Sequence, residues 1–247
     1  MSREVRVLPL RGIPELERGD DLGALIVAAA DATGGFEPRD VLVVAQKAVS
    51  KVEGQVVHLS DFEPSARARE LAGDDDARRL EVVLQESREI VRTRPPLVIA
   101  ETKHGFVCAS AGVDASNAKG PDTVVLLPSD PDASARRLRE RVRELADVDI
   151  GVIVSDSFGR AWRRGTTDVA LGVAGIAPLL DLKGHVDSVG YELHATEIAI
   201  ADEIAGAAEL VLGKTEGIPA AIVRGVDIEG EGSGQDLLMP RERDLFR

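Results

Sequence analysis

The stretch VDIGVIVSDSFGRAWRRGTTDVALG, residues 148–172, joins an apolar run to a cluster of polar and cationic side chains. The apolar run Val148–Val154 is typical of a buried strand, and we expect Asp156 and Ser157 at the end of that strand. Behind them come the lone tryptophan, Trp162, and three arginines, Arg160, Arg163 and Arg164. An aspartate beside cations and small hydroxyl residues suits an anion held next to a metal ion. The stretch therefore predicts a strand with a binding site at its end.

The segments on either side predict strands and helices in irregular order. Apolar runs bounded by turn signals predict strands over residues 5–10, 40–45, 90–114 (in pieces), 123–128 and 219–225. Apolar residues at helical spacing predict a helix over residues 20–32, Pro64 begins another over 64–71, and a further helical stretch follows to about residue 86. Residues 131–146 are the clearest helix, with a proline and acids in the first turn and arginines later, and residues 196–212 predict an Ala-rich helix. Because the two kinds of element do not alternate, the sequence favours an α+β (mixed α/β) fold with mixed, partly antiparallel sheets and packed helices. We expect one unit over residues 1–247, with two subdomains enclosing the site as an open alternative.

Bulk composition narrows the class of protein. Hydrophobic residues make up 44% of the 247 residues and charged residues 30%, which is typical of a soluble globular chain. The net charge of −13 argues against broad nucleic-acid binding, although a local group of arginines can still hold a small anion. Cys108 is the only cysteine, so no internal disulfide forms. Because no apolar segment suits a signal peptide or a membrane helix, we expect a cytoplasmic protein without membrane contact.

Two further segments place ionisable residues at expected strand ends. The segment QKAVSKVEG (46–54) is expected as a loop, and its lysines Lys47 and Lys51 can pair with phosphate oxygens. Taken alone, the segment favours an ordinary pair of surface lysines over a phosphate-binding role. The segment SAGVDASNAKGPD (110–122) offers Asp114 as a hard oxygen ligand for Mg²⁺ or Mn²⁺ bound with nucleotide phosphates. An Asx-turn in a loop is the alternative for that aspartate.

Several familiar nucleotide-binding and catalytic motifs are missing from the sequence. GAAELVLGKT (206–215) ends like a P-loop, but six residues separate its glycines and a helix precedes it, so the fold is not a P-loop fold. The sequence also lacks the G-x-G-x-x-G fingerprint of a Rossmann domain and the G-x-S-x-G elbow of a serine nucleophile. We therefore expect no catalytic nucleophile from the protein.

The ordered set of segments resembles one known family, the coenzyme F420-0:γ-glutamyl ligases. The resemblance runs from about residue 5 to the C-terminus and rests on LPLRGIPEL, GDDL, QKAVSKVEG, GVDASN, LLPSDPDASA, SDSFGRAWRRG, ADEIAGAAELVLGK and RERDLFR. It implies a family-specific ligase fold that attaches L-glutamate to the deazaflavin precursor F420-0, and then to F420-1. It also implies GTP as co-substrate, release of GDP and phosphate, Mg²⁺ or Mn²⁺, stimulation by K⁺, and a homodimer. Some relatives carry a nitroreductase-like domain, whereas this chain resembles the stand-alone form.

The resemblance also implies roles for individual residues. The positions that match GTP contacts of the family are Ile13, Pro14, Glu15, Leu16, Gln46, Lys51, Asn117, Gly213, Lys214 and Thr215. Those that match metal ligands are Asp114, Asp156, Ser157 and Glu216. Ser157 stands where the family usually has threonine, which keeps the hydroxyl. Gln46 occupies a position that varies in the family.

The residues themselves agree with this chemistry. A carboxylate acylates an amine only after activation, and phosphoryl transfer needs positioning and charge neutralisation more than a protein nucleophile. We expect Arg160 and Arg163 to hold substrate phosphate or carboxylate, and Arg164 to be a solvated neighbour. Three alternatives stay open from the sequence: a GTP-dependent glutamate ligase for another acceptor, a nucleotide- and metal-binding protein without turnover, and a metal-dependent phosphatase.

Overall fold

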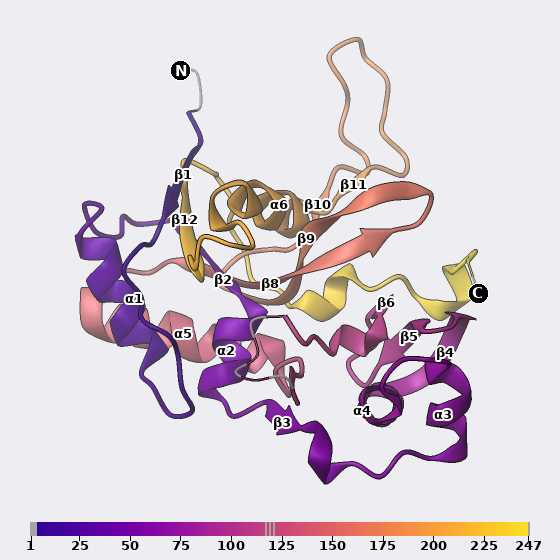
Figure 1. Cartoon of the computed structure of the whole chain (residues 1–247). Helices are drawn as coiled ribbons and strands as arrows, with labels where there is room; N and C mark the ends of the chain where they lie inside the picture. The colour runs from indigo at the N-terminus through magenta and orange to yellow at the C-terminus, as the bar shows by residue number, and fades with distance from the viewer. Residues whose placement is uncertain (1–3, 117, 119, 121, 247) are drawn as a thin grey trace.

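A five-stranded sheet is the centre of the computed structural model, which describes residues 4–116, 118, 120 and 122–246 (Figure 1). The strand order is β1-β12-β2-β8-β9, and only β2 and β8 run parallel to each other. The strands are β1 (Arg6–Pro9), β2 (Val41–Ala45), β8 (Gly151–Arg160), β9 (Arg163–Ala174) and β12 (Ala220–Arg224). This mixed, mostly antiparallel sheet with packed helices confirms the predicted α+β class.

Helices cover both faces of this sheet because its central strands are apolar on both sides. In β2, Leu42 and Val44 point to the core under α1 (Leu22–Asp31) and α5 (Pro131–Ala146). The alternate residues Val41 and Val43 point to the core under α6 (Ile200–Leu212), on the opposite face. Successive side chains of a strand point to opposite faces of the sheet, so a continuous run of apolar residues fits a strand that is covered on both faces. Figure 1 shows α1 and α5 on one side and α6 on the other.

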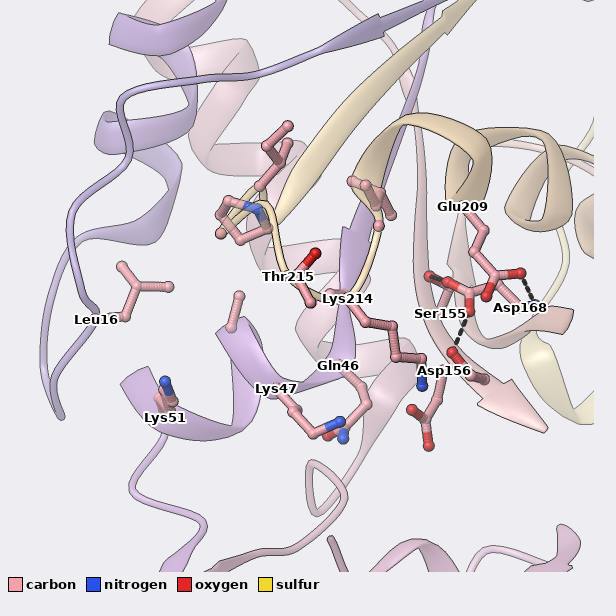
Figure 2. A pocket seen from close by; sticks show the side chains of 18 of the residues that line it. Leu16, Gln46, Lys47, Lys51, Ser155, Asp156, Asp168, Glu209, Lys214 and Thr215 are labelled. Carbon is pink, nitrogen blue, oxygen red and sulfur yellow. Dashed lines mark hydrogen bonds between the residues drawn. The ribbon is translucent and has the colours of Figure 1, made fainter. Parts of the chain in front are cut away.

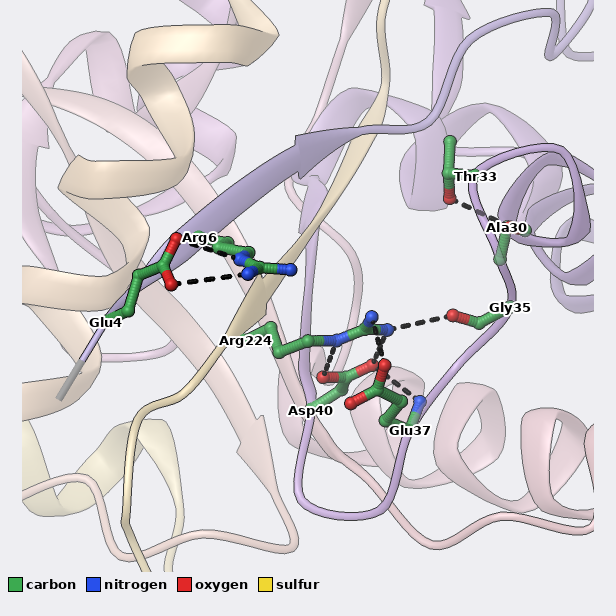
Figure 3. A network of polar contacts seen from close by, with 8 residues as sticks. All are labelled: Glu4, Arg6, Ala30, Thr33, Gly35, Glu37, Asp40 and Arg224. Atoms are coloured by element: carbon green, nitrogen blue, oxygen red, sulfur yellow. Dashed lines mark hydrogen bonds and ion pairs between the residues drawn. The ribbon is translucent and has the colours of Figure 1, made fainter. Parts of the chain in front are cut away.

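An internal ion pair fixes the outer end of this sheet (Figure 3). Asp40, which is 1% exposed, precedes β2, and Arg224 ends the neighbouring strand β12. The guanidinium donates two hydrogen bonds to the carboxylate, of 2.9 Å from Nε and 2.8 Å from Nη2. A buried carboxylate needs such a partner, and the pair ties two strands distant in sequence.

A second core lies beside the main sheet, in residues 56–126. It contains the sheet β4-β5-β6 and the ribbon β3-β7, with α3 and α4 packed against them. The elements are β3 (Val56–His58), α3 (Ala66–Ala72), α4 (Ala77–Gln85), β4 (Ser87–Arg94), β5 (Leu97–Thr102), β6 (Val107–Ala109) and β7 (Thr123–Val125). The side chains of Phe106, Leu127 and Leu171 form a small cluster that joins this part to β9.

The remaining elements are short. A hairpin arm projects from the molecule between β10 (Leu180–Asp181) and β11 (Glu197–Ile198), as Figure 1 shows. The 3₁₀ turns are η1 (Leu59–Asp61), η2 (Ser110–Gly112), η3 (Gly234–Leu237) and η4 (Arg241–Arg243). No helix in the described residues is long and apolar enough to cross a membrane.

Two predictions about the site-bearing segments were wrong. The segment 46–54 is not a loop, because helix α2 (Gln46–Val52) starts directly at the end of β2. The strand after Val148 does not end before Asp156. Strand β8 continues through Asp156 and Ser157 to Arg160, because β9 pairs with it along its whole length as a hairpin. Asp156 and Ser157 therefore lie within the paired part of the hairpin, and its exposed tip begins at Gly159.

Candidate active site

A cavity of about 440 Å³ opens at one edge of the main sheet (Figure 2). At this edge β2 ends at Ala45, and the parallel strand β8 continues beyond the core into the β8–β9 hairpin. The two strands are in register with Ala45 opposite Ser155, so the first residues of α2 lie beside Asp156 and Ser157. Carboxyl ends of parallel strands meet at one edge, which is where open α/β sheets place ligands. The segment before α1 and the loop after α6 complete the wall; lining residues from these two parts include Pro14, Leu16, Gly213, Lys214 and Thr215.

Lys47 connects the cavity to the second core. Its Nζ lies 2.7 Å from Oδ2 of Asp114, whose backbone forms an isolated antiparallel β-bridge with Val125, the last residue of β7. Burial opposes ionisation of Asp114, but the hydrogen bonds from Lys47 and Ser116 outweigh it and lower the pKa of Asp114. The Asp114 carboxylate is therefore ionised at neutral pH and is paired with Lys47, which lines the cavity.

Asp156 lies in a different environment. Burial raises the pKa of this carboxyl to about 6, with Lys47 opposing the shift and the charges of Asp168 and Asp114 adding to it. No lysine or arginine of the described residues forms an ion pair with Asp156. Asp156 lies near two other carboxylates, Asp168 and Asp114, so a cation bound among the three would stabilise its ionised form.

Asp168 is held by the strand opposite. Ser155 and Ser157 donate hydrogen bonds of 3.0 and 2.6 Å to its two carboxylate oxygens. Its backbone amide donates to Glu209 of α6 at 3.0 Å. Ser157 faces Asp168 directly in the β8–β9 register, so the hairpin itself creates this network.

Gln46 is 1% exposed and lies at the first turn of α2, among the cavity-lining residues. Its Oε1 accepts a hydrogen bond from Ser50 at 2.9 Å, while its Nε2 has no partner in the described part of the chain. A buried amide donor without a partner costs free energy unless a ligand oxygen accepts from it.

Cations and carboxylates are mixed in this cavity. Among the described lining residues, three lysines (Lys47, Lys51 and Lys214) face four carboxylates (Glu15, Asp156, Asp168 and Glu209). Lys51 is already paired with Glu15 at 2.6 Å. Figure 2 shows Lys47, Lys214 and Asp156 facing the same part of the cavity. The lysines can contact phosphates, but the carboxylates would repel a triphosphate that brought no metal with it.

The oxygen donors fit a hard divalent cation. Asp114, Asp156 and the Ser157 hydroxyl supply carboxylate and hydroxyl oxygens, which Mg²⁺ and Mn²⁺ accept. In the described residues, no three His, Cys, Asp or Glu side chains are grouped so as to hold a metal by themselves. Mg²⁺ is commonly bound by one or two carboxylates together with substrate phosphates, so this donor set fits a metal that arrives with a nucleotide.

The structure gathers most, but not all, of the residues expected at the site. Pro14, Glu15, Leu16, Gln46, Lys51, Asp156, Ser157, Gly213, Lys214 and Thr215 line the cavity, and Asp114 joins it through Lys47. Ile13 packs against the core under α1 instead, and Glu216 is exposed and outside the lining. Asn117 lies outside the described residues. Arg160 and Arg163 lie at the exposed tip of the β8–β9 hairpin, outside the lining.

The sequence reasoning missed Ser155, Asp168 and Glu209, which also line the cavity. Asp168 carries no local signal, because its position opposite Ser157 depends on the register of the β8–β9 hairpin. Glu209 carries none, because its approach depends on how α6 packs against β9.

Comparison with known proteins gives a consistent result. A sequence model of the F420-0:γ-glutamyl ligase family matches residues 12–225. The coenzyme F420:L-glutamate ligase of Methanocaldococcus jannaschii is 42% identical over 251 positions, which cover 100% of this chain and 98% of the relative. The proteins of the same name from Methanopyrus kandleri and Archaeoglobus fulgidus are 43% and 41% identical, each over 98% of this chain, and over 98% and 96% of their own length.

Proposed function

The chain belongs to the coenzyme F420-0:γ-glutamyl ligase family, and from this premise we propose that it joins L-glutamate to the carboxylate of the coenzyme F420 precursor at the expense of GTP. The product of the first cycle, F420-1, serves as acceptor for the next. The observation that carries the proposal is the cavity itself. It combines lysines for phosphate, the buried Gln46 side chain with its unpaired Nε2, and the carboxylate of Asp156, and Lys47 of its lining pairs with Asp114 as a second carboxylate suited to a metal.

The reaction takes two steps. An oxygen of the acceptor carboxylate attacks the γ-phosphorus of GTP, and the bond to the β-phosphate oxygen breaks, so GDP leaves with the electron pair. The acyl phosphate then accepts the glutamate amine at its carbonyl carbon. The amine loses a proton, the carbon–oxygen bond to phosphate breaks, and phosphate departs. No residue of the protein forms a covalent bond in either step, which agrees with the lack of a nucleophile motif.

Charge neutralisation is the main task of the site in the first step. Lys47, Lys51 and Lys214 face the cavity and can contact phosphate oxygens as point charges. Asp114, Asp156 and Ser157 would hold a divalent metal, which when bound supplies charge stabilisation to the transferring phosphoryl group. Because carboxylates line the same cavity, we propose that nucleotide binding depends on Mg²⁺ or Mn²⁺. The family resemblance adds stimulation by K⁺ and a homodimer to the proposal.

Release of GDP tests this function. We expect GDP and phosphate to form in equal amounts only when GTP, the deazaflavin precursor, glutamate and Mg²⁺ are all present. Omitting glutamate should stop turnover after at most one acyl phosphate per site. Steady GTP hydrolysis without acceptor and glutamate would instead support a phosphatase, and nucleotide binding without any turnover would support a binding protein.

A further inference from the structure

Asp168 of β9 carries a buried carboxylate that no cation of the described residues neutralises. The residue is 6% exposed, and no lysine, arginine or histidine in the part of the chain that the structure describes forms an ion pair with it. A buried carboxylate without a cationic partner costs free energy, because water no longer solvates its charge. Stability alone therefore does not account for this side chain, and its contacts indicate another role.

Two serine hydroxyls of β8 share this carboxylate. Ser155 donates to its Oδ2 at 3.0 Å, and Ser157 donates to its Oδ1 at 2.6 Å. Ser157 lies directly opposite Asp168 in the strand register, and Ser155 lies opposite Ala170, one diagonal step away. Glu209 of α6 holds the backbone of Asp168 by accepting a hydrogen bond of 3.0 Å from its amide (Figure 2). The strand register and the helix thus fix the carboxylate in front of Ser157.

The direction of the hydrogen bond decides what Ser157 offers to the cavity that it lines. A serine hydroxyl has one proton to donate and two lone pairs that accept. Because Ser157 gives its proton to Asp168, its oxygen presents lone pairs elsewhere, and a cation can take one of them. Without this acceptor on the opposite strand, the proton would be free to point into the cavity and repel a cation there.

The same hydrogen bond holds Ser157 in one side-chain conformation. The Cβ of serine carries no branch, so all three staggered rotamers are open to it, whereas a β-branched side chain such as threonine is restricted at χ1. Ser157 is only partly buried, so packing alone does not restrict it. The 2.6 Å contact with Asp168 selects one rotamer.

Resting on the function proposed above, we infer that Asp168 is a positioning residue for the metal that arrives with the nucleotide. It acts through Ser157: its carboxylate takes the hydroxyl proton and fixes the side chain, so that the oxygen is ready to bind Mg²⁺ or Mn²⁺. Metal ligands in proteins are commonly oriented by a further group in this way, and loss of that group weakens metal binding by about ten- to a hundredfold. The role requires an acceptor oxygen at residue 168 rather than its negative charge.

Binding of Mn²⁺ to the complex of the protein with GDP tests the inference without turnover. Free Mn²⁺ is measured by electron paramagnetic resonance during a titration. Asp168→Ala removes both the charge and the acceptor, and we expect it to raise the Kd for Mn²⁺ about thirtyfold. Asp168→Asn removes the same charge but keeps an oxygen that accepts from Ser157, so we expect a rise of only about threefold. Adding Ser157→Thr to Asp168→Ala should bring the Kd back to within about threefold of the unchanged protein, because the branch at Cβ restricts the hydroxyl again.

Asp202→Asn is the matched control. Asp202 of α6 is a partly buried carboxylate that also holds β9, but it accepts from the backbone amide of Ala170, at 2.8 Å, and lies outside the cavity lining. We expect an unchanged Kd for Mn²⁺ in this variant. The melting temperature of each variant without metal and nucleotide shows whether it is folded.

The pattern across the variants separates this inference from the proposed function. Equal losses in Asp168→Asn and Asp168→Ala would overturn the positioning role, because the charge of Asp168 or its own contact with the metal would then explain both. A failure of Ser157→Thr to restore binding, or a comparable loss in Asp202→Asn, would also overturn it. If Asp168→Ala does not fold, Asp168→Asn decides: a loss of about threefold supports the role, and one of about thirtyfold contradicts it. Absence of Mn²⁺ binding by the unchanged protein with GDP would overturn the proposed function, and the inference with it.

Discussion

Lys47 Nζ lies 2.7 Å from Asp114 Oδ2, and this ion pair joins helix α2 of the main sheet to the segment that bridges β7. The pair places a carboxylate from residues 110–122 beside Asp156 of β8, although the two aspartates are distant in sequence. The positive charge of Lys47 acts on both aspartates, because it pairs with Asp114 and also lowers the pKa of Asp156. A divalent metal placed here would compete with Lys47 for the carboxylates of Asp114 and Asp156.

Asp114→Asn and Asp156→Asn should each abolish ligation while the protein remains folded. Either change removes an anionic oxygen ligand and weakens metal-dependent charge stabilisation, which is worth several kcal/mol in such sites. The measurement is ligation rate against Mg²⁺ concentration. Asp187→Asn, in a turn of the projecting arm, is the control and should keep normal activity. Near-normal rates in either site variant at limiting Mg²⁺ would contradict the metal assignment.

Asp156→Asn should also stabilise the metal-free protein, in a pH-dependent manner. Burial raises the pKa of Asp156 from an ordinary value of 3.8 to about 6, so the folded protein binds this proton more tightly than the unfolded chain does. The carboxylate therefore costs stability in full above pH about 6, and the cost disappears below pH about 4. We expect a higher Tm for Asp156→Asn than for the unchanged protein at pH 7.5, and no difference at pH 4. Equal Tm values at both pH values would show that the group is not destabilised by burial.

Comparing alanine variants of Ser155 and Ser157 separates a metal-binding role of a hydroxyl from a purely structural one. Ser155 and Ser157 both donate to Asp168, so both alanine variants lose one hydrogen bond to the same carboxylate. Only Ser157 is proposed to bind the metal. Ser157→Ala should therefore raise the Mg²⁺ concentration needed for half-maximal rate by about tenfold, a cost near 1.4 kcal/mol, whereas Ser155→Ala should leave it unchanged. Ser157→Thr, which keeps the hydroxyl, should behave normally. Equal Mg²⁺ dependence in the two alanine variants would assign Ser157 to the network alone.

Close packing of the hairpin on α5 gives a stability prediction that is independent of function. A Cβ added at Gly172 of β9 would meet the backbone of Pro131, whereas one added at Gly159 of β8 would have no atom within 4 Å. We expect Gly172→Ala to cost about 2 kcal/mol or more in the free energy of unfolding, because backbone cannot move aside. Gly159→Ala should stay within about 0.5 kcal/mol. Denaturant unfolding of both variants measures the difference, and equal costs would refute the close approach.

The sequence predicted the elements whose signals are local. Helix α5 was predicted with its observed bounds, 131–146, since a proline and acids in its first turn and arginines later in the segment mark it locally. Strand β2 agreed within one residue because its β-branched run is buried on both faces. The length of β8 could not be predicted in this way. Pairing with β9 decides it, because Asp156 and Ser157, which suggested a strand end, pair with Val169 and Asp168 of the neighbouring strand.

The same distinction applies to the site. Asp156, Ser157 and Lys51 were expected there and do line the cavity, and their metal and nucleotide roles stay predictions. Asp168 and Glu209 were not expected, because their position depends on strand register and on helix packing rather than on any motif. Glu216, expected as a metal ligand, lies outside the lining, where Glu209 of α6 is found instead. The other expected GTP contacts and metal ligands came from the family resemblance alone, because no local sequence pattern indicates them.

Mass spectrometry of the acceptor tests the central claim most directly. The protein is incubated with the deazaflavin precursor, L-glutamate, GTP and Mn²⁺, and the acceptor mass is compared with that from a reaction without glutamate. The account predicts a gain of one or more glutamyl residues, with one GDP formed for each residue added. An acceptor of unchanged mass, while GTP is hydrolysed or left intact, would contradict it.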